Sequence, residues 1–223
     1  MWYYKTMKYT HLLFDLDGTL TDPKEGITKS VQHALLHFGI DVPDPNQLTC
    51  FIGPPLIPSF MEFYGLTQAQ AEEALVVYRE RFSTVGLFEN RVLDGIPEML
   101  ESLKAQGKVL AVASSKPEAF VLRILEHFEL LSYFDAVIGA TMDEKRTKKK
   151  DVIEEALRRL GPIDRRTVLM IGDRKHDVEG AALCELDSLG VYTGFAPAGE
   201  LEEAGATYIC HSIAEMSDLL QSL

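Results

Sequence analysis

The segment FDLDGTLTD, at residues 14–22, places two acids directly after the short apolar run LLF at residues 12–14. An apolar run followed by acid and glycine is typical of the point where a buried strand passes into a loop. Side chains two residues apart on an extended strand point in the same direction, so Asp15 and Asp17 share one face. Two like charges this close are costly to hold together without a positive charge between them. The pair therefore indicates a bound cation or catalytic chemistry.

The composition is that of an ordinary globular protein. The chain has 223 residues, of which 46% are hydrophobic and 25% charged. This length suits one large α/β domain, or a core domain with a smaller inserted one. A formal net charge of −12 argues against a nucleic acid polymer or an anionic membrane as the main partner. An acidic protein that handles phosphate needs a local positive site, such as a metal ion with a few lysines.

The cysteines and the N-terminus predict a cytoplasmic protein. Cys50, Cys184 and Cys210 are widely spaced and form no CxxC pair, which is typical of a reducing compartment without a zinc site. No stretch approaches the roughly 20 apolar residues that a transmembrane helix needs. Residues 1–6 lack the apolar region of a signal peptide, and Met7 is an alternative start. The sequence carries no signal for an oligomeric state.

Short β-rich runs alternate with helical patterns along most of the chain. Helical spacing of apolar residues occurs over 96–103, 117–128 and 152–160. Alternating strands and helices predict an α/β fold, with a Rossmann-like parallel sheet covered by helices on both faces. In such sheets, ligands bind beyond the carboxyl ends of the strands. The predicted strands are 11–14, 109–114, 136–138 and 167–171, with weaker ones at 188–192 and 208–210.

The long gap between the first two strands predicts an inserted domain. Its pattern is helical, with one apolar stripe from Ile27 to Phe38 and a second helix over 69–82. We interpret residues 23–89 as a helical cap domain, and residues 1–22 and 90–223 as the α/β core. Since both tethers of the insertion lie close to the end of the first strand, the cap can act as a lid. The alternative is an additional helical layer on the same core.

The predicted strand ends bring chemically useful residues to one edge of the sheet. Asp15 and Asp17 end the first strand, the second ends in SSK at 114–116, and the fourth runs into GDRKHD at 172–177. The basic run RTKKK, at 146–150, precedes the helix at 152–160. Carboxylates, a hydroxyl and lysines together form a plausible set of groups for moving a phosphoryl group.

Each of these groups meets a physical need of that reaction. A phosphate dianion repels an attacking carboxylate, and Mg²⁺ held by carboxylates screens this repulsion. A lysine and a serine hydroxyl hold the transferring oxygens, and a glycine-containing turn points N–H groups at them. Asp17 is placed to protonate the leaving oxygen and then to deprotonate the hydrolytic water.

The order of these motifs resembles that of haloacid dehalogenase superfamily phosphatases with a helical cap after the first strand. The segment DLDGT, at 15–19, matches the first motif of that family. The resemblance implies that Asp15 is the nucleophile and that Asp17 is the acid/base, with the Asp17 backbone carbonyl also on Mg²⁺. Ser114 matches the second motif, which binds the phosphoryl group. Asp173 and Asp177 match the fourth motif and are the further implied ligands of Mg²⁺.

The lysine of the third motif lies within three consecutive lysines. Related chains commonly read Lys-x-x-Val-Ile, which selects Lys149, with Lys148 as the alternative. The implied substrate-binding residues on the same edge are Gly18, Thr19, Ser115 and Lys116, and Arg79 is the implied one on the cap. For Lys116 a solvated surface role is a comparable alternative, and for Arg79 a salt bridge within the cap.

Four segments carry a closer resemblance to phosphoglycolate phosphatase-like and 5′-nucleotidase-like members: FIGPPL at 51–56, YRERF at 78–82, SSKP at 114–117 and GDRKHD at 172–177. The expected function is Mg²⁺-dependent hydrolysis of a small phosphorylated metabolite through an aspartyl phosphate. Phosphoglycolate, nucleoside monophosphates and a broader set of sugar phosphates all fit the sequence. The alternatives are a phosphomutase of the same superfamily and a non-enzymatic, phospho-accepting regulatory module.

Overall fold

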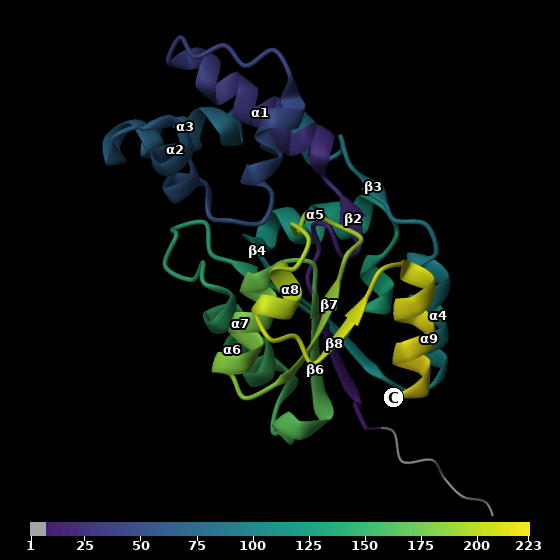
Figure 1. The fold of residues 1–223 in the computed structure, drawn as a ribbon. Coiled ribbons are helices and arrows are strands. Elements are labelled where there is room, and N and C mark those ends of the chain that lie inside the picture. The colour runs from purple at the N-terminus through teal and green to yellow at the C-terminus, as the bar shows by residue number, and fades with distance from the viewer. Residues whose placement is uncertain (1–7) are drawn as a thin grey trace, which may run out of the picture.

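A six-stranded parallel sheet forms the centre of the molecule (Figure 1). The computed structural model describes residues 8–223, so the predicted alternative start at Met7 lies outside the described residues. The strand order is β5-β4-β1-β6-β7-β8, which confirms the predicted α/β fold. The strands are β1 (His11–Phe14), β4 (Val109–Pro117), β5 (Ala136–Ala140), β6 (Val168–Gly172), β7 (Asp187–Val191) and β8 (Tyr208–Cys210).

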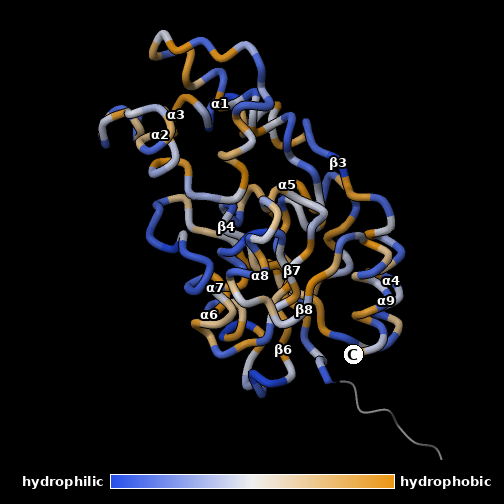
Figure 2. The backbone as a smooth tube through the Cα atoms, in the orientation of Figure 1, coloured by the Kyte–Doolittle hydropathy of each residue, from blue (hydrophilic) through white to orange (hydrophobic). Residues whose placement is uncertain are grey.

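Both faces of the sheet are buried because successive side chains of each strand point to opposite sides. In β1, Leu12 and Phe14 join one hydrophobic cluster and Leu13 joins the other. Figure 2 shows the most hydrophobic backbone in the middle of the molecule and polar segments at its periphery. The first face is covered by α4 (Ile96–Ala105), α5 (Glu118–His127) and α9 (Ile213–Ser222), and the second by α6 (Lys149–Leu160) and α7 (Lys175–Leu183).

The segment between β2 (Thr21–Asp22) and β3 (Arg91–Val92) forms a group of helices beyond the carboxyl edge of the sheet (Figure 1). The two predicted helices are present as α1 (Lys24–His37) and α3 (Gln68–Arg81). The sequence analysis did not predict α2 (Leu56–Tyr64), nor the antiparallel ribbon of β2 and β3. The remaining elements are a π-helical turn (Phe82–Gly86), 3₁₀ turns at Pro45–Phe51, Leu131–Tyr133 and Arg165–Thr167, and α8 (Glu200–Glu203).

Local capping explains where these helices begin and end. Thr67 and Gln70 form a reciprocal capping box at the start of α3. Gly65 ends α2 in the left-handed region, with a φ of 66°, which a glycine adopts without steric cost. Gly53, with a φ of 103°, makes the turn before Pro54 and Pro55 and so separates the 3₁₀ turn from α2.

The helical segment and the core are joined by apolar and polar contacts. Phe82 packs edge-on against Phe120 of α5, with ring centroids 5.7 Å apart. Arg174 donates to the Ile52 carbonyl at 2.7 Å, and Arg123 donates to the Ser83 carbonyl at 2.8 Å. The division at residues 23 and 89 stays a prediction, because buried residues on both sides belong to one hydrophobic cluster. Within residues 8–223, no helix has the length and apolar character needed to cross a bilayer.

Replacing Leu13 by Ala tests how strongly β1 depends on burial. Leu13 is fully buried between Ala111 and Met170 in the sheet, whereas Leu183 on α7 is 65% exposed. We expect Leu13→Ala to lower the free energy of unfolding in urea by about 2–5 kcal/mol. Leu183→Ala, the matched control, is expected to change it by less than about 0.5 kcal/mol. Equal losses in the two variants would contradict the assignment of β1 to the core.

Candidate active site

Asp15 and Asp17 directly follow β1, which lies at the centre of the sheet between β4 and β6. The Asp15 backbone N–H donates to the Ile171 carbonyl at 2.8 Å, which continues the ladder with β6 by one residue. The chain then turns tightly, since the Gly18 N–H donates to the Thr21 carbonyl at 2.7 Å. Asp15 and Asp17 are 7% and 9% exposed, respectively. The turn therefore holds two nearly buried carboxylates above the edge of the sheet.

Three carboxylates from two segments converge at this edge. Asp15, Asp173 and Asp177 each offer an oxygen, and these oxygens lie within 4.8 Å of one another. Asp173 follows β6 and accepts the Phe195 N–H at 2.7 Å. Gly18, with a φ of 80°, has to be a glycine here, because a Cβ atom would lie 2.2 Å from Asp173 Oδ2.

Lys149 supplies positive charge to this cluster. Its Nζ lies 3.0 Å from Asp15 Oδ1 and 2.7 Å from Asp177 Oδ1, and it donates to the Ala113 carbonyl at 2.9 Å. Burial alone would lower the pKa of Lys149, but the two neighbouring carboxylates raise it above its usual value, so the ammonium group stays charged. Lys148, the alternative in the sequence, is exposed.

One lysine does not balance three buried carboxylates. Burial raises the pKa of Asp173, and the charges of Asp177 and Asp15 raise it further. Burial also raises the pKa of Asp177, against the opposing effect of Lys149. The buried oxygens Asp15 Oδ1 and Asp177 Oδ1 both face the single ammonium group of Lys149. The cluster thus has more carboxylate oxygens than it has cations and hydrogen-bond donors to satisfy them. Such a cluster fits a hard divalent cation such as Mg²⁺.

A second ion pair lies next to the cluster. Lys116 Nζ is 2.8 Å from both carboxylate oxygens of Asp17 and 4.8 Å from the centroid of the Phe82 ring. Burial raises the pKa of Asp17, while Lys116 acts in the opposite direction. Ser114 is buried at the carboxyl end of β4, and its Oγ accepts the Lys116 backbone N–H at 3.3 Å. Lys116 thus connects the acid of the core with an aromatic ring of the helical segment.

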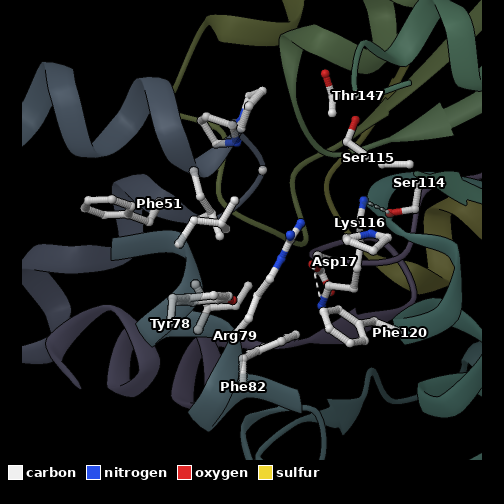
Figure 3. A pocket seen from close by; sticks show the side chains of 18 of the residues that line it. Asp17, Phe51, Tyr78, Arg79, Phe82, Ser114, Ser115, Lys116, Phe120 and Thr147 are labelled. Atoms are coloured by element: carbon white, nitrogen blue, oxygen red, sulfur yellow. Dashed lines mark hydrogen bonds and ion pairs between the residues drawn. The ribbon is translucent and has the colours of Figure 1, made fainter. Parts of the chain in front are cut away.

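A cavity of about 780 Å³, including its open mouth, connects these acids with the helical segment (Figure 3). Asp15, Asp17, Ser114, Ser115 and Lys116 form its polar side. The opposite side is mainly apolar and comes chiefly from the helical segment. Its principal members are Phe51, Leu56, Leu75, Tyr78, Phe82 and Phe120.

The other predicted residues are placed around the cavity in different ways. Arg79 extends from α3 into the cavity (Figure 3), where it donates to the Met142 carbonyl at 3.3 Å and pairs with Glu144. Lys149, Asp173 and Asp177 contact or adjoin Asp15 without lining the cavity. Thr19 is fully buried, and its hydroxyl has no hydrogen-bond partner among the described residues.

Sequence reasoning missed the loop between β5 and α6 and the aromatic wall. Glu144 and Thr147 line the cavity from that loop, and Phe51 lines it from the 3₁₀ turn. The only signal for the loop was its position after a strand end, since the partner of Glu144 lies 65 residues away in the sequence. The segment FIGPPL was recognised as characteristic, but its letters alone do not show which side chain faces the acids.

Comparison with known proteins assigns the family. Residues 12–191 match the family described as haloacid dehalogenase-like hydrolase. The chain therefore belongs to that family, which confirms the predicted family and the predicted class of enzyme. No further conclusion about the substrate follows from the family alone.

Three individual proteins are similar over most of the chain. A 5′-nucleotidase of Pseudomonas aeruginosa is 47% identical over 216 residues, which is 97% of each chain. Tyrosine-protein kinase PtkA of Mycobacterium tuberculosis is 41% identical over 95% of this chain and 72% of its own length. The crystal structure of a predicted phosphatase from Clostridium acetobutylicum superposes with a TM-score of 0.93, at 48% identity, over 96% of this chain and 99% of that one.

Replacing Lys149 by Met tests the charge balance of the cluster. Removing one partner of a buried ion pair costs about 3–5 kcal/mol, so we expect a loss of this size at pH 7 in EDTA. The unpaired carboxylates would have folded-state pKa values above the unfolded ones. Stability is then lost as the pH rises through the interval between the two values, so the deficit should shrink as the pH falls toward 5.

Urea unfolding of the variant at several pH values measures this effect. Added Mg²⁺ should recover part of the loss, because it supplies positive charge to the same carboxylates. The matched control is Lys148→Met, which removes an exposed charge from the adjacent residue. A deficit that is the same for both variants, or one that grows toward pH 5, would contradict this description of the cluster.

Proposed function

We propose that the protein is a cytoplasmic, Mg²⁺-dependent phosphatase that hydrolyses a small-molecule phosphate monoester through an aspartyl phosphate on Asp15. The observation that carries this proposal is the position of Asp15. Its carboxylate belongs both to the cluster with Asp173, Asp177 and Lys149 and to the lining of the cavity. A nucleophile in contact with a cation site and open to a substrate pocket is what this chemistry requires.

The cluster residues would hold the ion and orient the nucleophile. Asp15, Asp173, Asp177 and the Asp17 backbone carbonyl are the proposed ligands. A bound Mg²⁺ ion would screen the repulsion between the Asp15 carboxylate and the phosphate dianion. Lys149 holds the Asp15 carboxylate in place, because its Nζ contacts Asp15 Oδ1. Ser114 and Lys149 are the proposed donors to the phosphoryl oxygens. Gly18 and Thr19 are proposed to line the phosphate site as parts of the tight turn, since their N–H groups donate to the Thr21 and Leu16 carbonyls.

In the first step, an Asp15 oxygen forms a bond to phosphorus while the bond from phosphorus to the leaving oxygen breaks. Asp17 gives its proton to that leaving oxygen. In the second step, Asp17 takes a proton from a water molecule whose oxygen attacks phosphorus, and the bond to Asp15 breaks. Phosphate and the alcohol leave, and both carboxylates return to their initial states.

The Asp17–Lys116 ion pair explains how one carboxyl group can serve as acid and then as base. Burial favours protonated Asp17, whereas Lys116 favours the ionised form. An arriving phosphate dianion attracts the Lys116 ammonium, which leaves Asp17 to take up a proton from the solvent. Once phosphate has left, Asp17 releases that proton to the solvent and Lys116 returns to it. Ser115 lies beside this pair in the cavity lining and is a further proposed contact for the substrate.

We also propose that residues 23–89 act as a cap domain over the core formed by residues 1–22 and 90–223. The helical segment begins after β2 and ends before β3, and these two strands pair with each other. β2 directly follows the turn that carries Asp15 and Asp17. The helical segment supplies most of the apolar cavity wall. Closure of such a segment excludes water from the reacting groups, and opening admits the substrate.

The similarity to a protein named as a tyrosine kinase favours one competing activity, transfer of a phosphoryl group from ATP to tyrosine. A phosphomutase and a phospho-accepting regulatory module are further alternatives that use the same aspartates. Each alternative has a product that a phosphatase does not form. The kinase forms phosphotyrosine, the phosphomutase an isomerised phosphate ester, and the regulatory module a long-lived aspartyl phosphate.

Phosphate release with Mg²⁺ from a panel of monoesters tests the proposal. The panel holds p-nitrophenyl phosphate, phosphoglycolate, nucleoside 5′-monophosphates, sugar phosphates and pyrophosphate. Removing the nucleophile by Asp15→Asn should lower turnover by at least about 10³-fold. EDTA should also abolish turnover, and Mg²⁺ should restore it.

Asp218→Asn is the matched control, because Asp218 is an exposed acid on α9, outside the cavity lining. Turnover that survives in Asp15→Asn would contradict the proposed nucleophile. Absence of phosphate release from every ester, with phosphotyrosine formed from ATP and a tyrosine peptide, would replace the phosphatase by the kinase.

A further inference from the structure

The half of the cavity that faces the leaving group is apolar. Phe51 and Tyr78 lie across the cavity from Asp17, and Phe82 and Phe120 lie on the side of Lys116 (Figure 3). Tyr78 stacks on Phe82 with ring centroids 5.1 Å apart, and Phe51 packs against Phe60 at 5.0 Å. This mutual packing fixes the rings before any ligand binds. Such walls favour a flat or apolar group and disfavour a carboxylate, which would lose its hydration there.

Two cations line the cavity within the described residues, and both have carboxylate partners. Lys116 pairs with Asp17 on the phosphate side. Arg79, on the leaving-group side, pairs with Glu144. The Arg79 side chain is 21% exposed, so water screens its charge less than that of a surface residue, whereas Glu144 is 39% exposed and stays accessible to solvent. An anionic leaving group would have to compete with Glu144 for Arg79.

The loop between β5 and α6 is built to present Glu144. Thr141 and Arg146 close its base, because the Thr141 N–H donates to the Arg146 carbonyl at 3.0 Å and the Arg146 N–H donates to Thr141 Oγ1 at 3.0 Å. Glu144 lies at its tip with a φ of 59°, in a region that non-glycine residues rarely adopt. An observed outlier of this kind is a reason to look for a function.

We infer that Glu144 determines substrate specificity by neutralising Arg79, so that the site selects phosphate monoesters with an uncharged planar or apolar leaving group. A nucleoside or an aryl alcohol fits this description. A short carboxylate-bearing alcohol, such as the glycolate of phosphoglycolate, does not. This inference rests on the proposed phosphatase activity and concerns its substrate class. Glu144 acts through Arg79 and is a positioning residue for it.

The test is the ratio of two kcat/KM values, for adenosine 5′-monophosphate and for phosphoglycolate, with Mg²⁺. The parent should prefer the nucleotide. Glu144→Gln frees the Arg79 charge without changing the size of residue 144. It should shift the ratio toward phosphoglycolate by about 10-fold, the effect of one charge-assisted hydrogen bond. Adding Arg79→Met to Glu144→Gln should remove that shift.

The ratio separates specificity from any general effect of loosening the contact between α3 and the loop, because such an effect changes both kcat/KM values together. Asp143→Asn is the matched control. Asp143 is the adjacent acid in the same loop, but it pairs with Lys145 at 2.8 Å and does not line the cavity. It should leave the ratio within about twofold, since it removes the same charge from an exposed pair.

The outcomes distinguish the inference from the function on which it rests. A ratio that Glu144→Gln leaves unchanged, or moves no further than Asp143→Asn does, would overturn the role of Glu144. A parent that prefers phosphoglycolate would overturn the substrate class while retaining the phosphatase. A parent that releases no phosphate even from p-nitrophenyl phosphate would overturn the proposed function itself.

Discussion

The buried excess of negative charge at the carboxyl edge of the sheet is the constraint on which the site depends. Asp15 follows β1, and Asp173 and Asp177 follow β6. The parallel pairing of these two strands brings the three acids together around one ammonium group, that of Lys149. Hydrophobic packing alone would not select such a cluster, because buried carboxylates lose hydration energy. The fold tolerates it because the sheet and its helices are buried on both faces and supply the stability elsewhere.

The same constraint explains two glycines. Gly18 and Gly194 approach Asp173 so closely that a Cβ atom on either would lie within about 2.2 Å of its Oδ2. The Thr193 hydroxyl donates to the Gly18 carbonyl at 3.0 Å and holds the two segments together. Backbone thus encloses the acid from both sides, and Phe195 N–H occupies one of its oxygens. An oxygen of Asp173 lies within 4.8 Å of oxygens of Asp15 and Asp177.

Much of this arrangement could be predicted from the sequence, because local patterns determine it. The apolar runs before Asp15, Ser114 and Asp173 gave the strands, and topology then placed their ends on one edge. The pattern Lys-x-x-Val-Ile of related chains selected Lys149, and Val152 and Ile153 of that pattern lie in the core. The ribbon of β2 and β3 and the helix α2 were missed because they are too short for a clear period.

What the sequence could not show is pairing between distant polar residues. Lys116 and Asp17 are 99 positions apart, and Arg79 and Glu144 are 65 apart. Nothing in the local pattern distinguishes such residues from solvated surface charges. The Lys116–Asp17 pair depends on the pairing of β4 with β1, and the Arg79–Glu144 pair depends on how the helical segment sits over the sheet. Both are properties of the tertiary structure.

The position of the Arg79–Glu144 pair links closure of the cavity to choice of substrate. Arg79 belongs to α3 and Glu144 to the loop before α6, so their contact spans the cavity between the helical segment and the core. A leaving group that competes for Arg79 also removes a contact that holds the two parts together. An uncharged planar group instead adds apolar contacts to both parts, since Phe51 and Phe82 come from the helical segment and Phe120 from the core. The same contact that excludes an anionic leaving group therefore stabilises the closed cavity around a neutral one.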